Sequence, residues 1–363
     1  MTRIPVTVLT GFLGAGKTTL LNRLMTQPGF GDTAVIVNEF GEAGVDGGLI
    51  MRADERAFAM STGCLCCTVT GDVRLPLLRL LDEAERGVGP SFARVVIETT
   101  GLADPAPVLQ MFMANDYMFN RFTLNGVAVL VDAINGADTL QRFAEARRQV
   151  AVADLLIVTK GDLARPSASR NDLADLGRTL SRLNPNARVV DAAEATAETV
   201  FSLAAFDPSG KPPDVRNWLR LDGGEDRAPD HRHRHDHGHG RGVNRHGDAA
   251  SAYCFSATGP VDPRALEDAI TALRTTFGRD LLRVKGLVEI AGHPSSPCVL
   301  HVVGHVSSPS RQLDGWPEGV DATRLVVIVS GADRAVAPEM LGGFLPELRT
   351  LGRTPQVSEG ALR

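Results

Sequence analysis

Residues 4–19 read IPVTVLTGFLGAGKTT, and this stretch decides the fold. The apolar run from Ile4 to Thr10 predicts a buried β-strand, and the residues from Thr19 onward have helical spacing. Between them, GFLGAGKT fits the pattern G-x-x-x-x-G-K-[ST], in which backbone amides and a helix N-terminus point at a phosphate. Such a turn can also be only a tight connection, but the Lys-Thr pair in register favours binding of a nucleoside triphosphate.

This loop predicts specific contacts with a nucleotide. We expect the Lys17 ammonium to reach the β- and γ-phosphates and the Thr18 hydroxyl to bind Mg²⁺. The residues of the loop that we expect to contact the nucleotide are Gly11, Gly14, Ala15, Gly16, Lys17, Thr18 and Thr19.

Composition excludes several classes of protein. The chain has 363 residues, 43% of them hydrophobic and 22% charged, which is ordinary for a globular protein with room for two domains. Its formal net charge of -5 lacks the basic excess of proteins that bind nucleic acid. The first strand leaves no room for a signal peptide, and no apolar stretch approaches the roughly 20 residues of a membrane span. We therefore expect a cytoplasmic protein without nucleic-acid or membrane partners.

Up to about residue 206, short apolar runs alternate with helical patterns. After the first run, the apolar runs are residues 34–37, 94–97, 126–131, 155–158 and 188–190. Alternation of this kind predicts an α/β fold with a doubly wound, mainly parallel sheet, as in P-loop NTPases, and a ligand site at the carboxyl ends of the strands.

The second part of the chain has a different character. Residues 207–250 are rich in Pro, Gly and His and predict a disordered linker between a domain at 1–206 and another at 251–363. The later residues predict a smaller α+β domain with mainly antiparallel strands. Its strand-like runs are residues 253–256, 286–290, 298–303 and 324–329, and its helical stretches lie near 263–277 and 335–341.

The predicted strand at 94–97 is followed by ETTG, a second element with the chemistry of a phosphate sensor. Glu98 would organise Mg²⁺ or its water, and the amide of Gly101 can meet the γ-phosphate. Leu102 stands where many GTPases have a glutamine that positions the attacking water. We therefore expect slow intrinsic hydrolysis, with Lys17, Thr18 and Glu98 as the catalytic residues.

Residues 159–162 read TKGD and resemble the base-reading motif N-K-x-D of GTPases. Asp162 would accept hydrogen bonds from guanine, and the stem of Lys160 would cover the ring. Thr159 replaces the asparagine whose amide usually ties this loop to the phosphate-binding loop. A polar turn after a strand is the alternative interpretation.

Three of the five cysteines lie together at Cys64, Cys66 and Cys67. An odd number of cysteines suits a reducing compartment and metal or thiol chemistry better than a set of disulfides. Three thiolates favour Zn²⁺, with Co²⁺ as an alternative, and leave a fourth position for a carboxylate such as Glu42, for water or for a client ligand. Small, buried thiols without a metal are the other interpretation.

Histidines alternate with other residues in the predicted linker. They are His231, His233, His235, His237 and His239. Imidazoles at this density in a flexible segment predict an arm that collects Zn²⁺, Co²⁺ or Ni²⁺, although a solvated linker would have the same pattern.

The motifs GFLGAGKTTLL, VNEFGEAGVD, GCLCC, ETTGLADPAP and TKGD, in this order, resemble the CobW-type family of P-loop GTPases, which act as metal chaperones or insertases. The stretch that begins at Arg283, RVKGLVEIAGHPSSPCVLHVVG, resembles the C-terminal domain of that family. The resemblance covers nearly all of the chain. It implies that GTP completes a high-affinity metal site at the three clustered cysteines and that hydrolysis loosens this site beside a client protein.

The leading hypothesis is thus a GTP-hydrolysing zinc chaperone that binds GTP and GDP and serves an unidentified client metalloprotein. A variant of it delivers cobalt for cobalamin biosynthesis or to a cobalt or iron enzyme. A passive metal buffer would leave the nucleotide site vestigial, and a P-loop kinase would leave the clustered cysteines without a role. The sequence does not decide whether the chain forms a homo-oligomer.

Overall fold

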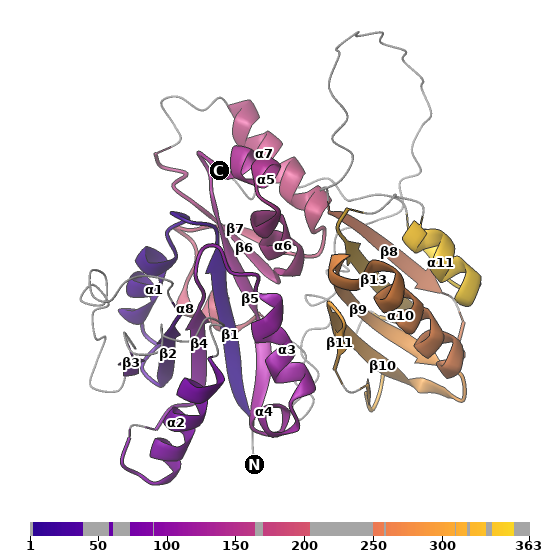
Figure 1. Cartoon of the computed structure of the whole chain (residues 1–363), viewed down its shortest axis with the longest axis horizontal. Helices are drawn as coiled ribbons and strands as arrows, with labels where there is room; N and C mark the ends of the chain where they lie inside the picture. The colour runs from indigo at the N-terminus through magenta and orange to yellow at the C-terminus, as the bar shows by residue number, and fades with distance from the viewer. Residues whose placement is uncertain are drawn as a thin grey trace.

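The computed structural model contains two β-sheets, each with its own helices (Figure 1). The structure describes residues 3–38, 58–60, 73–89, 91–163, 170–203, 250–257, 259–308, 310–317, 320–331 and 336–351. We call residues 3–203 the N-terminal domain and residues 250–351 the C-terminal domain. None of the helices within these ranges is long and apolar enough to cross a membrane.

The sheet of the N-terminal domain is parallel throughout and has seven strands in the order β3-β2-β4-β1-β5-β6-β7. The strands are β1 (Ile4–Gly11), β2 (Thr33–Val37), β3 (Phe58–Met60), β4 (Arg94–Glu98), β5 (Phe122–Asp132), β6 (Leu155–Thr159) and β7 (Arg188–Asp191). Six of them were predicted from apolar runs. The short edge strand β3 was not.

Helices cover both faces of this sheet, which explains why its strands are continuously apolar. On β1, Val6 and Val8 face the larger apolar core, with α2, α3, α5, α6 and α7, whereas Leu9 faces α1 and α8. The helices are α1 (Lys17–Met25), α2 (Arg74–Glu85), α3 (Ala106–Ala114), α4 (Asp116–Arg121), α5 (Gly136–Arg142), α6 (Ala144–Val152), α7 (Arg170–Leu183) and α8 (Ala197–Phe201). The predicted doubly wound α/β fold is confirmed.

The C-terminal domain is built on an antiparallel sheet in the order β11-β10-β9-β13-β8-β14, with β12 paired to β10. The strands are β8 (Ser251–Ala257), β9 (Leu281–Ile290), β10 (His293–Val303), β11 (Val306–Ser307), β12 (Arg311–Gln312), β13 (Thr323–Val329) and β14 (Arg349–Leu351). Helices α10 (Pro263–Phe277) and α11 (Val336–Phe344) pack on one face of this sheet, with Leu273 and Leu341 in the shared core. This confirms the predicted smaller α+β domain.

The opposite face of the C-terminal sheet packs against the N-terminal domain. Leu282, Val303 and Ile328 belong to the same apolar core as Leu109 of α3 and Val152 of α6. Figure 1 shows the sheet beside these two helices. The two domains thus share a core.

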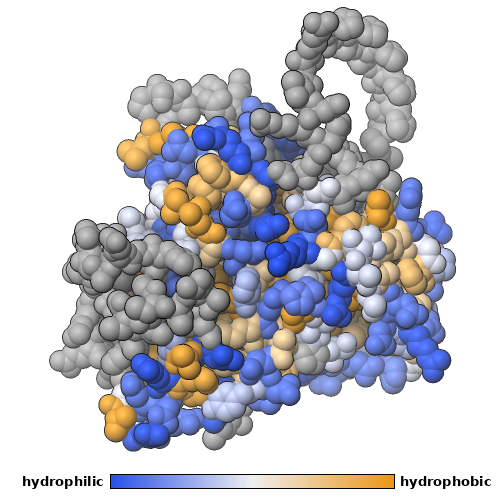
Figure 2. Space-filling view, viewed as in Figure 1, coloured by the Kyte–Doolittle hydropathy of each residue, from blue (hydrophilic) through white to orange (hydrophobic). Residues whose placement is uncertain are grey.

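On the outer surface, hydrophilic residues predominate on the face that Figure 2 shows, and apolar residues form several separate groups.

Candidate nucleotide-binding site

The phosphate-binding loop lies between the end of β1 at Gly11 and the start of α1 at Lys17. Gly16 precedes the helix with a φ of +88°, a left-handed backbone conformation that residues other than glycine rarely adopt. The first turn of α1 carries no acidic residue, and its N-cap makes no side-chain hydrogen bond within the described residues. The positive end of the helix dipole therefore faces the loop, as anion binding requires.

The side chains of Lys17 and Thr18 are both held at this loop. Lys17 Nζ donates to the carbonyl oxygens of Gly11 at 3.0 Å and Phe12 at 3.3 Å. Thr18 Oγ1 donates to Glu98 Oε1 at 2.8 Å, and Glu98 is only 1% exposed. The structure therefore brings together two predicted site residues that are far apart in the sequence. A hydroxyl and a buried carboxylate side by side are oxygen ligands that suit Mg²⁺.

Gly101 lies against the phosphate-binding loop. A Cβ atom at this position would stand 2.7 Å from the backbone nitrogen of Leu13 and 2.8 Å from its Cα. No side chain fits without moving the loop, so the approach of the two segments requires glycine. The carbonyl oxygens of Gly101 and Ala103 both accept from Gln149 Nε2, at 3.1 and 3.0 Å.

The predicted base-reading loop follows β6. Thr159 is buried, and its hydroxyl donates to the carbonyl oxygen of Ala15 at 2.9 Å. Thr159 lacks the asparagine amide that usually ties this loop to the phosphate-binding loop. The Thr159 hydroxyl supplies that tie instead. Asp162 is exposed in the middle of the turn that follows, residues 161–163.

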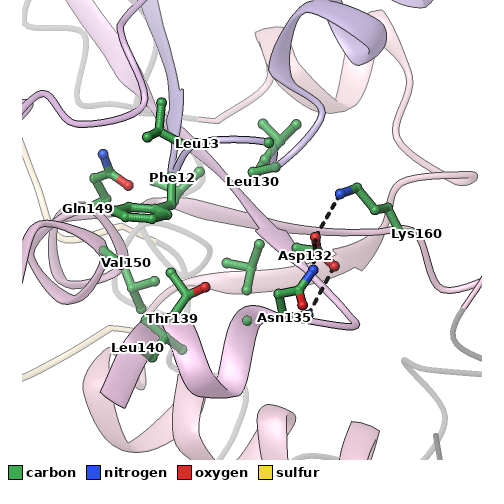
Figure 3. Close-up of a pocket in the computed structure, with 16 residues that line it drawn as sticks. Phe12, Leu13, Leu130, Asp132, Asn135, Thr139, Leu140, Gln149, Val150 and Lys160 are labelled. Atoms are coloured by element: carbon green, nitrogen blue, oxygen red, sulfur yellow. Dashed lines mark hydrogen bonds and ion pairs between the residues drawn. The ribbon is translucent and has the colours of Figure 1, made fainter. Parts of the chain in front are cut away.

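Lys160 is held by Asp132, an acidic residue that belongs to none of the sequence motifs. Its Nζ donates to Asp132 Oδ2 at 2.7 Å, and its φ of +60° is the only positive value among the described residues other than glycine (Figure 3). Asp132 ends β5 and also accepts from Ile134 and Asn135. Burial alone would raise the pKa of Asp132, but the hydrogen bonds from Lys160 and Asn135 hold it below its usual value. Its position at the carboxyl end of a predicted strand was the available signal.

A cavity of about 240 Å³ opens beside the phosphate-binding loop. Its apolar wall includes Phe12, Leu130 and Val150, and the side chains of Asp132 and Lys160 border it (Figure 3). The cavity lies between the loop, the end of β5 and helices α5 and α6.

The residues predicted to bind Zn²⁺, Co²⁺ or Ni²⁺ lie outside the described residues. These are Glu42, Cys64, Cys66, Cys67, His231, His233, His235, His237 and His239. Within the described ranges, no group of three His, Cys, Asp or Glu residues is arranged to hold a metal ion. Burial raises the pKa of the thiols of Cys254 and Cys298, as expected for unreactive cysteines that serve in packing.

Two sequence profiles of known families match the chain. The profile described as "CobW/HypB/UreG, nucleotide-binding domain" matches residues 5–191. The profile described as "Cobalamin synthesis protein cobW C-terminal domain" matches residues 250–345. The first match falls in the N-terminal domain and the second in the C-terminal domain.

Curated relatives carry names that refer to zinc. The chain is 32% identical to the zinc chaperone CobW of Pseudomonas aeruginosa, over 94% of the chain and 91% of that protein. It is 40% identical to the zinc chaperone YjiA of Escherichia coli, over 52% of the chain and 57% of that protein. The zinc-regulated GTPase metalloprotein activator 1 of Schizosaccharomyces pombe is 31% identical over 57% of the chain and 50% of its own length.

A solved structure shares the whole arrangement. The Zn(II)-bound YjiA GTPase from E. coli superimposes with a TM-score of 0.65 and 26% identity, over 95% of this chain and 99% of that one. The resemblance that the motifs indicated is thus confirmed over both domains. The chain belongs to the CobW-type family of P-loop GTPases.

Proposed function

We propose that this protein is a GTP-hydrolysing metallochaperone that carries zinc to a client protein. The observation that carries the proposal is the hydrogen bond between Thr18 and Glu98, because it joins the phosphate-binding loop to the segment that would sense the γ-phosphate. The names of the relatives, zinc chaperone and zinc-regulated GTPase, support the choice of cargo. We also propose that it acts in the cytoplasm, where free thiols persist.

In this proposal, each residue of the nucleotide site has a defined task. Lys17 contacts the β- and γ-phosphates, and Thr18 with Glu98 would hold Mg²⁺. Mg²⁺, when bound, neutralises negative charge on the phosphates. The backbone at Gly101 approaches the loop closely enough to respond to a γ-phosphate.

Guanine specificity belongs to the loop after β6. Asp162 accepts from the base, the stem of Lys160 covers it, and Thr159 fixes the loop to the phosphate-binding loop. Hydrolysis is slow in the isolated protein, because Leu102 cannot position a water molecule as a glutamine side chain does.

The cargo site is formed by the thiolates of Cys64, Cys66 and Cys67, with Glu42 as the candidate fourth ligand. The cysteines lie in the sequence between β2 and β4, Glu98 is the last residue of β4, and Gly101 follows three residues later. Ordering of these segments by GTP would change the arrangement of the thiolates. The histidines at 231–239 collect metal for this site. Cobalt is the alternative cargo, and a passive metal buffer is the alternative function.

The test measures Zn²⁺ and Co²⁺ affinity with Mg²⁺ and a non-hydrolysable GTP analogue, with GDP, and without nucleotide. A variant that lacks residues 231–246 keeps the histidines from masking the site. We expect the GTP analogue to tighten zinc binding at least tenfold, equivalent to about 1.4 kcal/mol of coupling.

Cys66→Ala should abolish the nucleotide-dependent binding, and Cys298→Ala, in the C-terminal domain, is the matched control. Metal affinity that ignores the nucleotide would make the protein a buffer, or a GTPase with a structural metal. Transfer of phosphate to a small metabolite would indicate a kinase.

A further inference from the structure

We propose that Gln149 is a positioning residue for the nucleotide-sensing segment at Gly101–Ala103, and that the C-terminal domain holds the helix that carries it. The inference rests on the proposed binding of GTP and GDP. It predicts that the docking of the C-terminal domain and the preference for one nucleotide over the other depend on each other.

Helix α6 contacts the sensing segment through the side chain of Gln149. Gln149 is 1% exposed, and its Nε2 group donates to the carbonyl oxygens of Gly101 and Ala103. Arg148 of the same helix lies near Asp104, with 3.7 Å between Nη1 and Oδ2. Loss of the buried amide would leave the carbonyl oxygens of Gly101 and Ala103 without this donor, which is costly for a buried acceptor such as that of Gly101. The segment is therefore held in place by α6.

The carboxyl end of α6, three residues after Gln149, is held by hydrogen bonds from both domains. The carbonyl oxygens of Val150, Ala151 and Ala153 accept from Asn184 Nδ2, at 2.8, 3.1 and 2.8 Å. The carbonyl oxygen of Val152 accepts from Nη1 of Arg283, a residue of β9 in the C-terminal domain. Helix ends need such partners, and here one of them comes from the other domain.

A buried cluster of charges lies directly beyond α6. Asp154 pairs with Arg283, at 3.1 and 3.2 Å, and with Lys285, and it accepts from the Val127 amide. All three charged side chains are at most 6% exposed. Burial would raise the pKa of Asp154, but the charges of Arg283 and Lys285 hold it well below its usual value. These ion pairs, together with the hydrogen bond from Arg283 to Val152, join β9 directly to the end of α6, so the C-terminal domain should move with α6.

Helix α3 supplies a second connection. It begins at Ala106, shortly after the sensing segment, and its Gln110 donates to the carbonyl oxygen of Val303 in β10 at 3.0 Å. At the neighbouring Gly304, a Cβ atom would stand 2.7 Å from Gln110 Nε2. Both helices that adjoin the sensing segment therefore reach the C-terminal domain (Figure 1).

Coupling of this kind is reciprocal. If GTP and GDP favour different positions of the Gly101–Ala103 segment, a change at the domain interface must alter the two nucleotide affinities unequally. An interface that serves only stability predicts something else, because both affinities would then stay the same or change by the same factor. The ratio of the two dissociation constants separates these cases.

The experiment uses the full chain and measures the dissociation constants of GDP and of a non-hydrolysable GTP analogue with Mg²⁺. We expect Gln149→Leu and Lys285→Met to change the ratio of the two constants at least threefold and in the same direction. The control Arg264→Met alters an exposed residue at the start of α10 and should leave the ratio unchanged. Lys285→Arg, which keeps the charge, should restore most of the wild-type ratio.

A measurement on the unaltered protein covers variants that fail to fold. Hydrogen exchange of the β9 amides, residues 281–290, should differ between the states with GDP and with the GTP analogue. Equal exchange in both states, or folded variants with the wild-type ratio, would overturn the inference while the proposed function stands. A wild-type chain that binds neither nucleotide would overturn the proposed function and this inference with it.

Discussion

The pair formed by Lys160 and Asp132 shows how a single residue can be prepared for recognition. Lys160 adopts a left-handed backbone conformation, which costs energy for a residue with a side chain. Its ammonium is fixed by a carboxylate that is itself fixed by two backbone amides and the Asn135 side chain. The lysine stem is thereby restricted, and in the proposed recognition of guanine this would reduce the entropy lost on binding.

Asp132→Asn should therefore weaken GTP binding about three- to tenfold, equivalent to roughly 1 kcal/mol, and should reduce the preference for GTP over ATP. The amide oxygen can still accept from Ile134 and Asn135, but the lysine loses its charged partner. Competition titration with both nucleotides measures the effect. Asp138→Asn, in an exposed pair with Arg142, is the control. Equal GTP affinity in both variants would show that the pair does not orient Lys160 for binding.

At the scale of elements, the length of a pattern decided what the sequence could predict. Apolar runs of four or more residues correctly predicted β2, β4, β6 and the strands of the C-terminal core, whereas β3, β11 and β12 have only two or three residues and carry no periodicity. The phosphate-binding loop was predicted because its contacts are local. Gln149 and Asp132 were not predicted, because neither belongs to a motif and their partners lie in other parts of the chain.

Helix α10 offers a test of local stability. Asp262 caps it by accepting from the amides of Arg264 and Ala265, at 2.8 and 3.0 Å, and Pro263 occupies the first turn. We expect Asp262→Ala to lower the free energy of unfolding of the C-terminal domain by about 1 kcal/mol, measured by urea denaturation. Asp268→Ala, at an exposed position within the same helix, should change it by less than about half as much. Similar losses in both variants would mean that the cap contributes little.

At the scale of the whole molecule, the domain interface contains a titratable group. His301 of β10 has its Nε2 atom 3.4 Å from Nη2 of Arg283, and it also lies near Lys285 and Asp154. Burial, and then the positive charges of Arg283 and Lys285, lower its pKa well below the usual 6.5, although Asp154 acts in the opposite direction. The unfolded chain therefore binds a proton on this histidine more readily than the folded protein does.

Stability should accordingly fall as the pH drops below 6.5. Between roughly pH 7.5 and 5.5, we expect the wild-type protein to lose about 1.4 kcal/mol more than His301→Gln, which can still accept from Arg283 but does not titrate. Urea denaturation at the two pH values gives the comparison. The same pH dependence in both proteins would assign the effect to other groups.

Asp154 and Thr159 lie at opposite ends of β6, and this separation bears on whether the protein can bind two partners at once. The C-terminal domain is anchored where the strand begins, and the loop predicted to read the base follows where it ends, five residues or about 16 Å further on. All five residues of the strand are buried, so it acts as a stiff spacer. A macromolecule bound to the C-terminal domain and a nucleotide entering at the far rim would then occupy separate surfaces, and one molecule could hold both at the same time.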